Sequence, residues 1–401
     1  MLTLEEAQAR LLALVPPSKT NKIETHKASG LYLAEDVAAA RTQPAADLSA
    51  MDGYATCGTG PWTRIGESRA GTPFDGELAH GECTRISTGA HMPNGSDRVL
   101  IQENASIEGT FVRLASGETY PEPGMHVRKA GFDFSTGETV LKMGTCIGPA
   151  QIALAAAAGQ AYLPVSSPPK IAILESGDEL VRLPAEIDEH QIPASNGVML
   201  AAMVAPIAGN PEILGPVPDD MDALAVALSN ADNCDVLITS AGASVGEHDL
   251  IQRALEEWGA EIDFWKVAIK PGKPLMIATR MTNGRRQIIL GLPGNPVSSF
   301  VTCFLFARPL IRAMMGSAAP LPIAEAVTSA VDIPSGGSRH EFLRGSLQNG
   351  EASMTDNQDS SALRALGNAN CLIDRPPNCP AVATGDAVKI FNLDNGAILR
   401  D

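Results

Sequence analysis

Three short loops in the middle of the chain have the composition of an anion-binding site. Each follows an apolar run and is rich in small residues: Ser176–Glu179, Thr239–Gly246 and Gly291–Ser298. In an open parallel sheet, the loops at the carboxyl ends of neighbouring strands form the ligand crevice. Their backbone amides, and the positive end of a helix that follows, favour anions. The three loops therefore predict a site for a phosphate or another oxyanion.

Three lysines lie between the second and third loops of an otherwise acidic protein. They are Lys266, Lys270 and Lys273, within the segment 265–274. Strand alternation predicts that Lys266 and Lys270 lie on the same side of one strand, where they would neutralise an oxyanion or phosphate. The alternative is a solvated edge strand, on which lysines discourage aggregation.

Carboxylates gather at the same predicted strand ends: Asp178, Glu179, Asp219, Asp220, Glu247 and Asp249. Phosphate substrates commonly recruit Mg²⁺ through one or two carboxylates together with the substrate's own oxygens. The alternative for some of these acids, Asp249 in particular, is a helix cap. The seven histidines are dispersed and do not indicate a histidine-based metal site.

The elements around the loops alternate between strand and helix. We expect strands at 170–174, 212–217 and 235–240, and helices at 196–207, 221–231 and 249–258. This alternation predicts a parallel sheet with helices on both faces. A last long helix begins at Asn295, has Pro296 in its first turn and runs to about Met315.

The predicted fold class is multidomain α/β plus β, with a central three-layer α/β domain whose sheet is mostly parallel. We place this domain at 169–319 and a small β-barrel at 320–401. Residues 45–135 are rich in Gly, Thr, Ser and Pro, which predicts a β-rich domain. We expect this domain to be inserted into a helix-containing N-terminal domain, formed by 1–44 and 136–168.

The composition excludes several classes of protein. The chain has 401 residues, 44% of them hydrophobic, and a net charge of −16. It is therefore neither disordered nor a general nucleic-acid binder. Its seven cysteines are odd in number and contain no C-x-x-C pair, which predicts a reducing, cytoplasmic location. The most apolar stretch, 152–165, is too short to cross a membrane, so we expect no membrane segment.

Five motifs together resemble one known family. They are Ser49–Ala55, Thr88–Val99, Ser176–Leu180, Lys266–Pro274 and Gly291–Ser298. In this order they resemble the molybdopterin molybdenumtransferases, which include MoeA and the gephyrin E domain. The α/β unit alone is shared with the adenylyltransferases of the same pathway, and the N-terminal motifs separate the two.

The resemblance implies a four-domain homodimer that inserts molybdate into adenylated molybdopterin. AMP leaves, molybdenum cofactor forms, and Mg²⁺ is required. The implied protein partners are the pathway adenylyltransferase and apo-molybdoenzymes, in transient contacts. The residue types do not distinguish molybdate from tungstate, because both are tetrahedral dianions of similar size.

The family motifs assign roles to residues of the α/β domain. The catalytic acids and lysines implied are Glu179, Asp219, Asp249, Lys266, Lys270 and Lys273, with Glu179 and Asp249 also as metal ligands. The second loop would hold the phosphate region of the pterin through Ser240, Gly242, Ser244 and Gly246. The third loop would bind substrate through Pro293, Asn295, Pro296 and Ser298.

Other implied site residues come from outside the α/β domain. Asp52 of the partner subunit and Thr88 would face the α/β domain across the cleft of a dimer. Arg128 and Asp133 match a family stretch with an Arg and an Asp at this spacing. Ser360 matches a serine of the C-terminal domain near the site. Asp52 and Asp133 are thereby candidate catalytic acids, and the other three are candidate substrate-binding residues.

Two departures from the family pattern keep an alternative open. Phe132 stands where the family usually has Glu, and Ala241 stands where the phosphate loop usually has a second Gly. A Cβ at a position that needs a positive φ would cost about 1 kcal/mol or more. One alternative is therefore a non-catalytic carrier or scaffold for the pterin. A separate alternative, which does not depend on these departures, is an adenylyltransferase that acts on molybdopterin with ATP.

Overall fold

The computed structural model describes residues 1–241 and 250–393. The chain forms two compact units. Unit 1 consists of Met1–Asn21, Gly30–Ala34 and Val165–Asp401, and unit 2 of Lys22–Ser29 and Glu35–Pro164. The finer division of the chain into four domains stays a prediction.

A six-stranded sheet forms the centre of unit 1, in the order β16-β13-β17-β21-β20-β18. In that order the strands are Glu212–Val217, Ile171–Ser176, Val236–Thr239, Arg285–Gly291, Pro274–Thr282 and Glu261–Lys266. The first four are parallel, whereas β20 is antiparallel to both of its neighbours. The prediction of a mostly parallel sheet is thereby confirmed.

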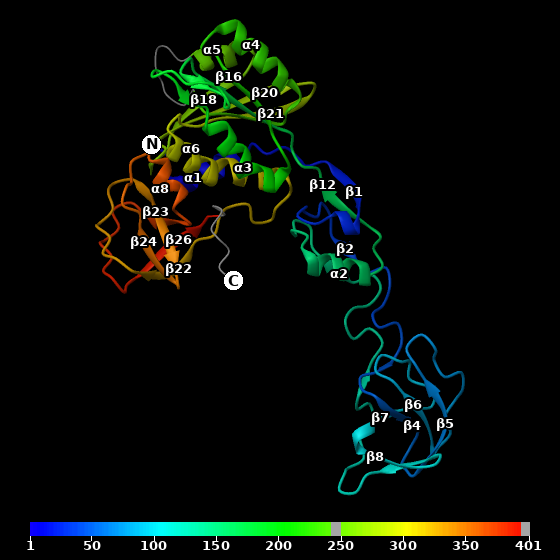
Figure 1. The fold of residues 1–401 in the computed structure, drawn as a ribbon. Coiled ribbons are helices and arrows are strands. Elements are labelled where there is room, and N and C mark those ends of the chain that lie inside the picture. The colour runs from blue at the N-terminus through cyan, green and yellow to red at the C-terminus, as the bar shows by residue number, and fades with distance from the viewer. Residues whose placement is uncertain (242–249, 394–401) are drawn as a thin grey trace. The chain divides into compact units, whose positions relative to one another are not determined.

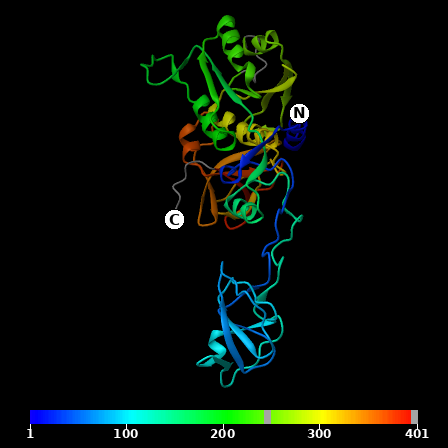
Figure 2. The same cartoon turned by 90° about the vertical axis from the view of Figure 1, so that its right-hand side faces the viewer.

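Helices cover both faces of this sheet, as Figures 1 and 2 show. On one face lies α3 (Asn196–Ala208), and on the other lie α4 (Met221–Asn230) and α5 (Leu250–Glu257). Helix α1 (Leu4–Leu12) packs against the long helix described next. Alternate residues of β13 point to opposite faces: Ile171 and Ile173 join the core beneath α3, and Ala172 and Leu174 join the core beneath α4 and α5. The nearly continuous apolar runs in the sequence reflect this burial on both faces.

The long helix begins where the sequence places it, with Asn295 as the N-cap and Pro296 in the first turn. It consists of α6 (Pro296–Thr302), a π-helical turn η4 (Cys303–Ala307) and α7 (Arg308–Met314). The stretch Pro296–Met314 is long and apolar enough to cross a membrane, but 89% of it is buried inside the protein. It therefore has the surroundings of a core helix.

A buried glutamine explains how this helix tolerates a proline. Pro309 has no N–H, so the carbonyl of Leu305, four residues earlier, loses its helical donor. Gln8 of α1 is 7% exposed, and its Nε2 donates to Leu305 O at 2.9 Å. The N-terminal helix thereby satisfies the carbonyl that the proline leaves open and is fixed to the core.

The C-terminal part of unit 1 is a closed five-stranded barrel. Its strands follow the order β23-β24-β22-β26-β25, and β25 pairs back with β23. They are His340–Gln348, Glu351–Met354, Glu325–Ser329, Ala387–Asn392 and Cys371–Arg375. Strand β19 (Ile269–Lys270) adds to β23, and α8 (Leu363–Gly367) lies between β24 and β25 in the sequence. The predicted small barrel is confirmed.

Unit 2 contains a second six-stranded sheet, in the order β7-β4-β6-β5-β9-β8. These strands are Arg98–Ile101, Gly53–Thr56, Glu82–Ile86, Trp62–Ser68, Phe111–Leu114 and Ala105–Glu108. Gly53 is required here, because a Cβ would lie 2.1 Å from Leu100 O on the paired strand. The β-rich character predicted for this region is confirmed.

Unit 2 also contains the shorter elements β2 (Val37–Ala38), β3 (Leu48–Ser49), β10 (Val127–Arg128), β11 (Thr139–Leu141) and α2 (Pro149–Ala157). Strands β1 (Thr20–Glu24) and β12 (Tyr162–Ser166) each have residues in both units. Strand β3 pairs with β10, and β2 pairs with β11, both antiparallel.

Replacing Gln8 tests the contact between α1 and the long helix. We expect Gln8→Met to keep the volume but leave Leu305 O buried without a donor, which costs about 1–3 kcal/mol of stability. Thermal or urea unfolding measures the loss, with Gln348→Met on the exposed end of β23 as the matched control. Equal stability of the two variants would show that the Gln8 bond contributes nothing.

Candidate active site

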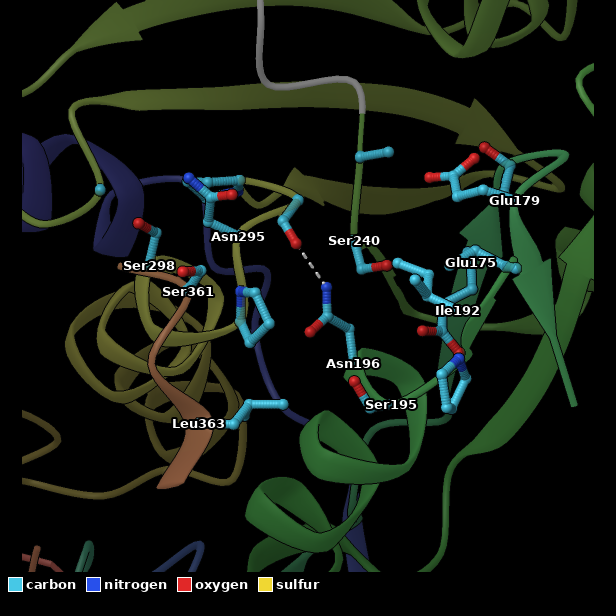
Figure 3. Close-up of a pocket in the computed structure, with 18 of the residues that line it drawn as sticks. Glu175, Glu179, Ile192, Ser195, Asn196, Ser240, Asn295, Ser298, Ser361 and Leu363 are labelled. Atoms are coloured by element: carbon cyan, nitrogen blue, oxygen red, sulfur yellow. Dashed lines mark hydrogen bonds between the residues drawn. The ribbon is translucent and has the colours of Figure 1, made fainter. Parts of the chain in front are cut away.

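A cavity of about 790 Å³ opens at the carboxyl ends of the parallel strands of unit 1. Six of the predicted site residues line it: Glu179, Ser240, Pro293, Asn295, Pro296 and Ser298. Figure 3 shows Asn295, Ser298 and Ser361 on one side, Glu175 and Glu179 on the other, and Asn196 between them. The three loops predicted to meet at one sheet edge therefore share one cavity.

The parallel register explains why these loops meet. Leu174 of β13 pairs with Thr239 of β17, and Thr239 pairs with Gly291 of β21. Strands β17 and β21 thus end at the same level, β13 continues for two residues beyond it, and the residues that follow all three face the same space. Backbone N–H groups stabilise the edge, since Leu292 N donates to Thr239 O at 2.8 Å.

The serine predicted from the C-terminal motif lies at the start of the long helix. Asn295 is the N-cap of α6, but its side chain makes no capping bond. Its Nδ2 instead donates to Ser360 Oγ at 3.1 Å, and Val297 N donates to Ser360 O at 3.1 Å. The barrel loop is therefore bonded directly to the third loop, and its Ser361 lines the cavity.

A buried arginine of the barrel holds in place the loop that contains Ser360 and Ser361, here called the serine loop. Arg344 is 1% exposed, and its Nη2 donates to Asn357 O at 3.2 Å and to Asp359 O at 3.0 Å. Gln358 accepts from Arg344 N at 3.0 Å and donates to Arg344 O at 2.9 Å. Arg344 is a positioning residue that the motifs did not indicate, because its role depends on contacts across the barrel.

Asp359 stabilises the turn of the same loop. Its Oδ1 accepts from Ser361 N at 2.8 Å and from Ser361 Oγ at 2.6 Å. These two bonds lower the pKa of Asp359. A carboxylate at this position therefore orients Ser361 toward the cavity wall.

Glu175 is a second residue that the sequence reasoning missed. It is the residue before last in β13, is 2% exposed and lines the cavity. Burial raises its pKa, an effect that the backbone N–H groups of Gly197 and Asn196 partly oppose. A Cβ at Gly197 would lie 2.2 Å from Glu175 Oε2, so any larger residue there would displace this carboxylate. A charged residue inside an otherwise apolar strand was the available signal.

Asn196 connects the start of α3 to the third loop. Its Nδ2 donates to Gly294 O at 2.7 Å, the bond drawn in Figure 3. Its Oδ1 is buried and has no partner among the described residues. Because a buried acceptor without a donor is costly, this oxygen is suited to accept a hydrogen bond from a ligand in the cavity.

The predicted acids divide into a cluster and a helix cap. Asp219 N donates to Asp178 Oδ1 at 3.0 Å, and burial followed by the charges of Asp178 and Glu179 raises the pKa of Asp219. Asp220 caps α4, because its Oδ1 accepts from Ala223 N at 2.9 Å. Glu247 and Asp249 lie outside the described residues. In the described part of the chain, no three acidic, His or Cys residues form a metal-binding group.

The prediction that Lys266 and Lys270 share one strand is wrong. Lys266 ends β18 in the central sheet, whereas Lys270 belongs to β19, which pairs with the barrel. The chain turns between them, at Val267–Ala268, because Val267 N bonds to Lys273 O and Ala268 N bonds to Leu2 O. Lys270 Nζ lies 3.0 Å from Glu341 Oε1 of the barrel.

The segment 265–274, which contains the three lysines, contacts the cavity only through its turn and the residue after it. Gly272 and Pro274 line the cavity, and the three lysines are not among the described residues that do so. Lys266 and Lys273 are exposed. Strand β18 is an edge strand of the sheet. Lys266 therefore lies on an exposed edge strand, as the alternative interpretation of the lysines expects.

The second loop is described only at its start. Ser240 is buried and lines the cavity, and Gly242, Ser244 and Gly246 lie outside the described residues. Ala241 is not among the described non-glycine residues with a positive φ. The expected backbone penalty of an alanine at this position therefore does not arise.

The predicted site residues of unit 2 form one close pair. Asp52 Oδ1 accepts from Thr88 N at 2.7 Å and from Thr88 Oγ1 at 3.1 Å, and these bonds lower the pKa of Asp52. Arg128 in β10 and Asp133 are exposed, and Phe132 is 75% exposed. Their part in a site shared with a partner subunit stays a prediction.

Removing the Arg344 side chain tests its hold on the serine loop. We expect Arg344→Leu to raise amide hydrogen exchange at Val297 and Thr355 by about tenfold or more, because two bonds of about 1 kcal/mol each are lost. Arg364→Leu, at an exposed position of α8, is the matched control. Unchanged exchange in Arg344→Leu would contradict the positioning role.

The buried Glu175 predicts a defined pH dependence of stability. Its pKa is raised from 4.5 in the folded chain, so the folded chain binds this proton more tightly than the unfolded chain does. The stability it contributes is complete below about pH 4.5 and declines as the pH rises through the folded pKa. We therefore expect the melting temperature of Glu175→Gln minus that of wild type to increase as the pH rises to about 7.

The control for this measurement is Glu212→Gln, at an exposed position of β16. It should follow the wild-type curve throughout. A constant difference between Glu175→Gln and wild type across this pH range would contradict the raised pKa.

Three family models match consecutive segments of the chain. The MoeA N-terminal region (domain I and II) matches residues 2–159. A probable molybdopterin binding domain matches residues 172–313, and the MoeA C-terminal region (domain IV) matches residues 326–393. Together they cover the sheet of unit 2, the central sheet and the barrel.

Whole proteins with the same arrangement are similar to this chain. It is 31% identical to a molybdopterin molybdenumtransferase of Haemophilus influenzae, over 97% of this chain and 98% of the relative. A Nostoc relative of the same name is 36% identical over 82% of this chain and 77% of its own length. The crystal structure of a Pyrococcus horikoshii OT3 moeA protein superposes with a TM-score of 0.82 at 27% identity, covering 98% of this chain and 100% of that one. The chain therefore belongs to the molybdopterin molybdenumtransferase family, the family of MoeA.

Proposed function

We propose that this protein inserts molybdate into adenylated molybdopterin, releases AMP and yields molybdenum cofactor. The observation that carries the proposal is the single cavity that joins the three loops of the central sheet to the serine loop of the barrel. A relative that is named for this transferase aligns with the chain over 98% of its own length. The activity makes the protein a transferase of molybdenum cofactor biosynthesis.

The chemistry of the cavity suits these substrates. The pterin phosphate, the leaving AMP and molybdate are all anions, and they require donors and positive charge arranged in advance. The start of the long helix, with the hydroxyl groups of Ser240, Ser298 and Ser361 nearby, supplies such donors. Asn196 Oδ1 supplies an acceptor for an N–H or O–H of the substrate.

The lysines are the proposed source of positive charge. Lys266, Lys270 and Lys273 follow the family motif, and the turn that contains two of them reaches the cavity at Gly272. Lys270 is paired with Glu341, whose side chain is 17% exposed, so the barrel restrains this lysine next to the central sheet. We assign Gly242, Ser244, Gly246 and Asp249 to the same site from the motif alone.

The charges around Asp219 support a magnesium ion as part of the proposed site. Repulsion from Asp178 and Glu179 contributes to the raised pKa of Asp219, and a divalent cation compensates such crowding of carboxylates. We propose that Glu179 and Asp249 bind Mg²⁺ and that Asp219 lies beside it. When bound, the ion would neutralise phosphate charge and orient the leaving group.

We further propose that the protein acts as a homodimer in the cytoplasm. Asp52, Thr88, Arg128 and Asp133 then act across the dimer cleft, and Phe132 lies beside Asp133 in the sequence. The support is the order of the N-terminal motifs. Contacts with the pathway adenylyltransferase and with apo-molybdoenzymes belong to the same proposal.

Substitutions at the central site test the proposed reaction. We expect Lys270→Ala and Asp219→Asn each to lower molybdate-dependent AMP release by about 100-fold or more, because each removes a charge from the reacting region. Asp222→Asn, in the first turn of α4 and not among the assigned site residues, is the matched control and should keep wild-type activity.

The same assay separates the alternatives. Near-wild-type turnover in both Lys270→Ala and Asp219→Asn would overturn the assignment of the site. Tight binding of adenylated molybdopterin without AMP release would identify a carrier. ATP consumption that depends on molybdopterin but not on molybdate would identify an adenylyltransferase.

A further inference from the structure

A second cavity of unit 1 lies at the amino ends of the parallel strands of the central sheet, opposite the candidate active site. It has a volume of about 430 Å³. Lys170 and Asp235 line it, directly before β13 and β17, and Arg285 lines it at the start of β21. These strands extend by about 3.3 Å per residue, so the amino ends lie roughly 20 Å from the candidate active site. The two cavities have no described lining residue in common.

This cavity is positively charged in a protein whose net charge is −16. Four cationic side chains line it, against one carboxylate: Lys19, Lys170, Arg285, Arg286 and Asp235. Arg285 Nη1 lies 3.3 Å from Asp235 Oδ1, and Lys170 N also donates to this carboxylate at 2.8 Å. The carboxylate is thus occupied by groups at the base of the cavity.

The remaining cations are available to a ligand. Lys19, Lys170 and Arg286 are exposed, and within residues 1–241 and 250–393 none of them makes an ion pair. Arg286 makes a long bond of 3.4 Å to Leu14 O. A concave group of like charges focuses the field and attracts an anion even in an acidic protein.

The walls of the cavity are rigid and partly apolar. Two proline pairs and Met314 form them: Pro16, Pro17, Pro168 and Pro169 with Met314. The two proline segments are bonded to each other, since Ser167 N donates to Lys19 O at 2.8 Å and Asn21 Nδ2 donates to Ser167 Oγ at 2.8 Å. The walls are therefore held in place without a ligand, which lowers the entropy cost of binding one.

We propose that this second cavity, the basic proline pocket, binds a small phosphate monoester with an apolar or aromatic body. Lys19, Lys170 and Arg286 hold the phosphate, and the prolines and Met314 contact the body. Lysine supplies a point charge and arginine a planar fork, the combination suited to phosphate oxygens. The volume lies within the usual range for small-molecule sites, about 300–1,000 Å³. This site is independent of the proposed transferase reaction.

Binding of AMP to the full chain tests the pocket. We expect Lys19→Gln/Arg286→Gln to remove one AMP site per chain, or to weaken it by at least about tenfold, as measured by isothermal titration. The matched control, Lys142→Gln/Arg253→Gln, removes the same charge elsewhere on the surface. The readout is the difference of one site between the two double variants, so it holds whether or not AMP also binds at the candidate active site.

Two further probes define the ligand. Adenosine should not bind the pocket, because it lacks the phosphate, and inorganic phosphate should bind more weakly than AMP, because it lacks the apolar body. Molybdate-dependent AMP release by Lys19→Gln/Arg286→Gln should equal that of wild type. Equal AMP binding in both double variants, or equal binding of adenosine and AMP, would overturn the proposal.

Discussion

The register of three parallel strands determines where chemistry is possible in this protein. Because β13, β17 and β21 are aligned, the residues that follow them open into one cavity and the residues that precede them open into another. A shift of one strand by two residues would keep its buried faces but move its loop out of the cavity by about 7 Å. The packing of both sheet faces against helices prevents such a shift.

Two sets of bonds connect the barrel to the loops at the carboxyl ends of these strands. The Arg344 side chain fixes the serine loop, and Ser360 of that loop bonds to the third loop of the sheet. Strand β19 carries Lys270 onto the barrel, where Glu341 pairs with it. The cavity is therefore built by the α/β sheet and the barrel together, and a substitution deep in the barrel can alter it.

Sequence patterns predicted the elements and the three loops well, because these depend on local periodicity and on capping. The start of the long helix at Asn295 and Pro296 is an example. The sequence patterns did not predict roles that depend on partners far away in the chain. Arg344 contacts a loop thirteen to fifteen residues away, and Glu175 contacts the start of α3. The lysines were misplaced because a short turn moves the chain from one sheet to another, which alternation alone does not predict.

The central claim is that this cavity performs molybdate insertion. The most direct test is AMP release from purified adenylated molybdopterin by the wild-type chain with Mg²⁺, with and without molybdate. The account predicts release that requires molybdate and is stoichiometric with the molybdenum cofactor formed. Binding of the adenylated pterin with no release at any molybdate concentration would contradict it.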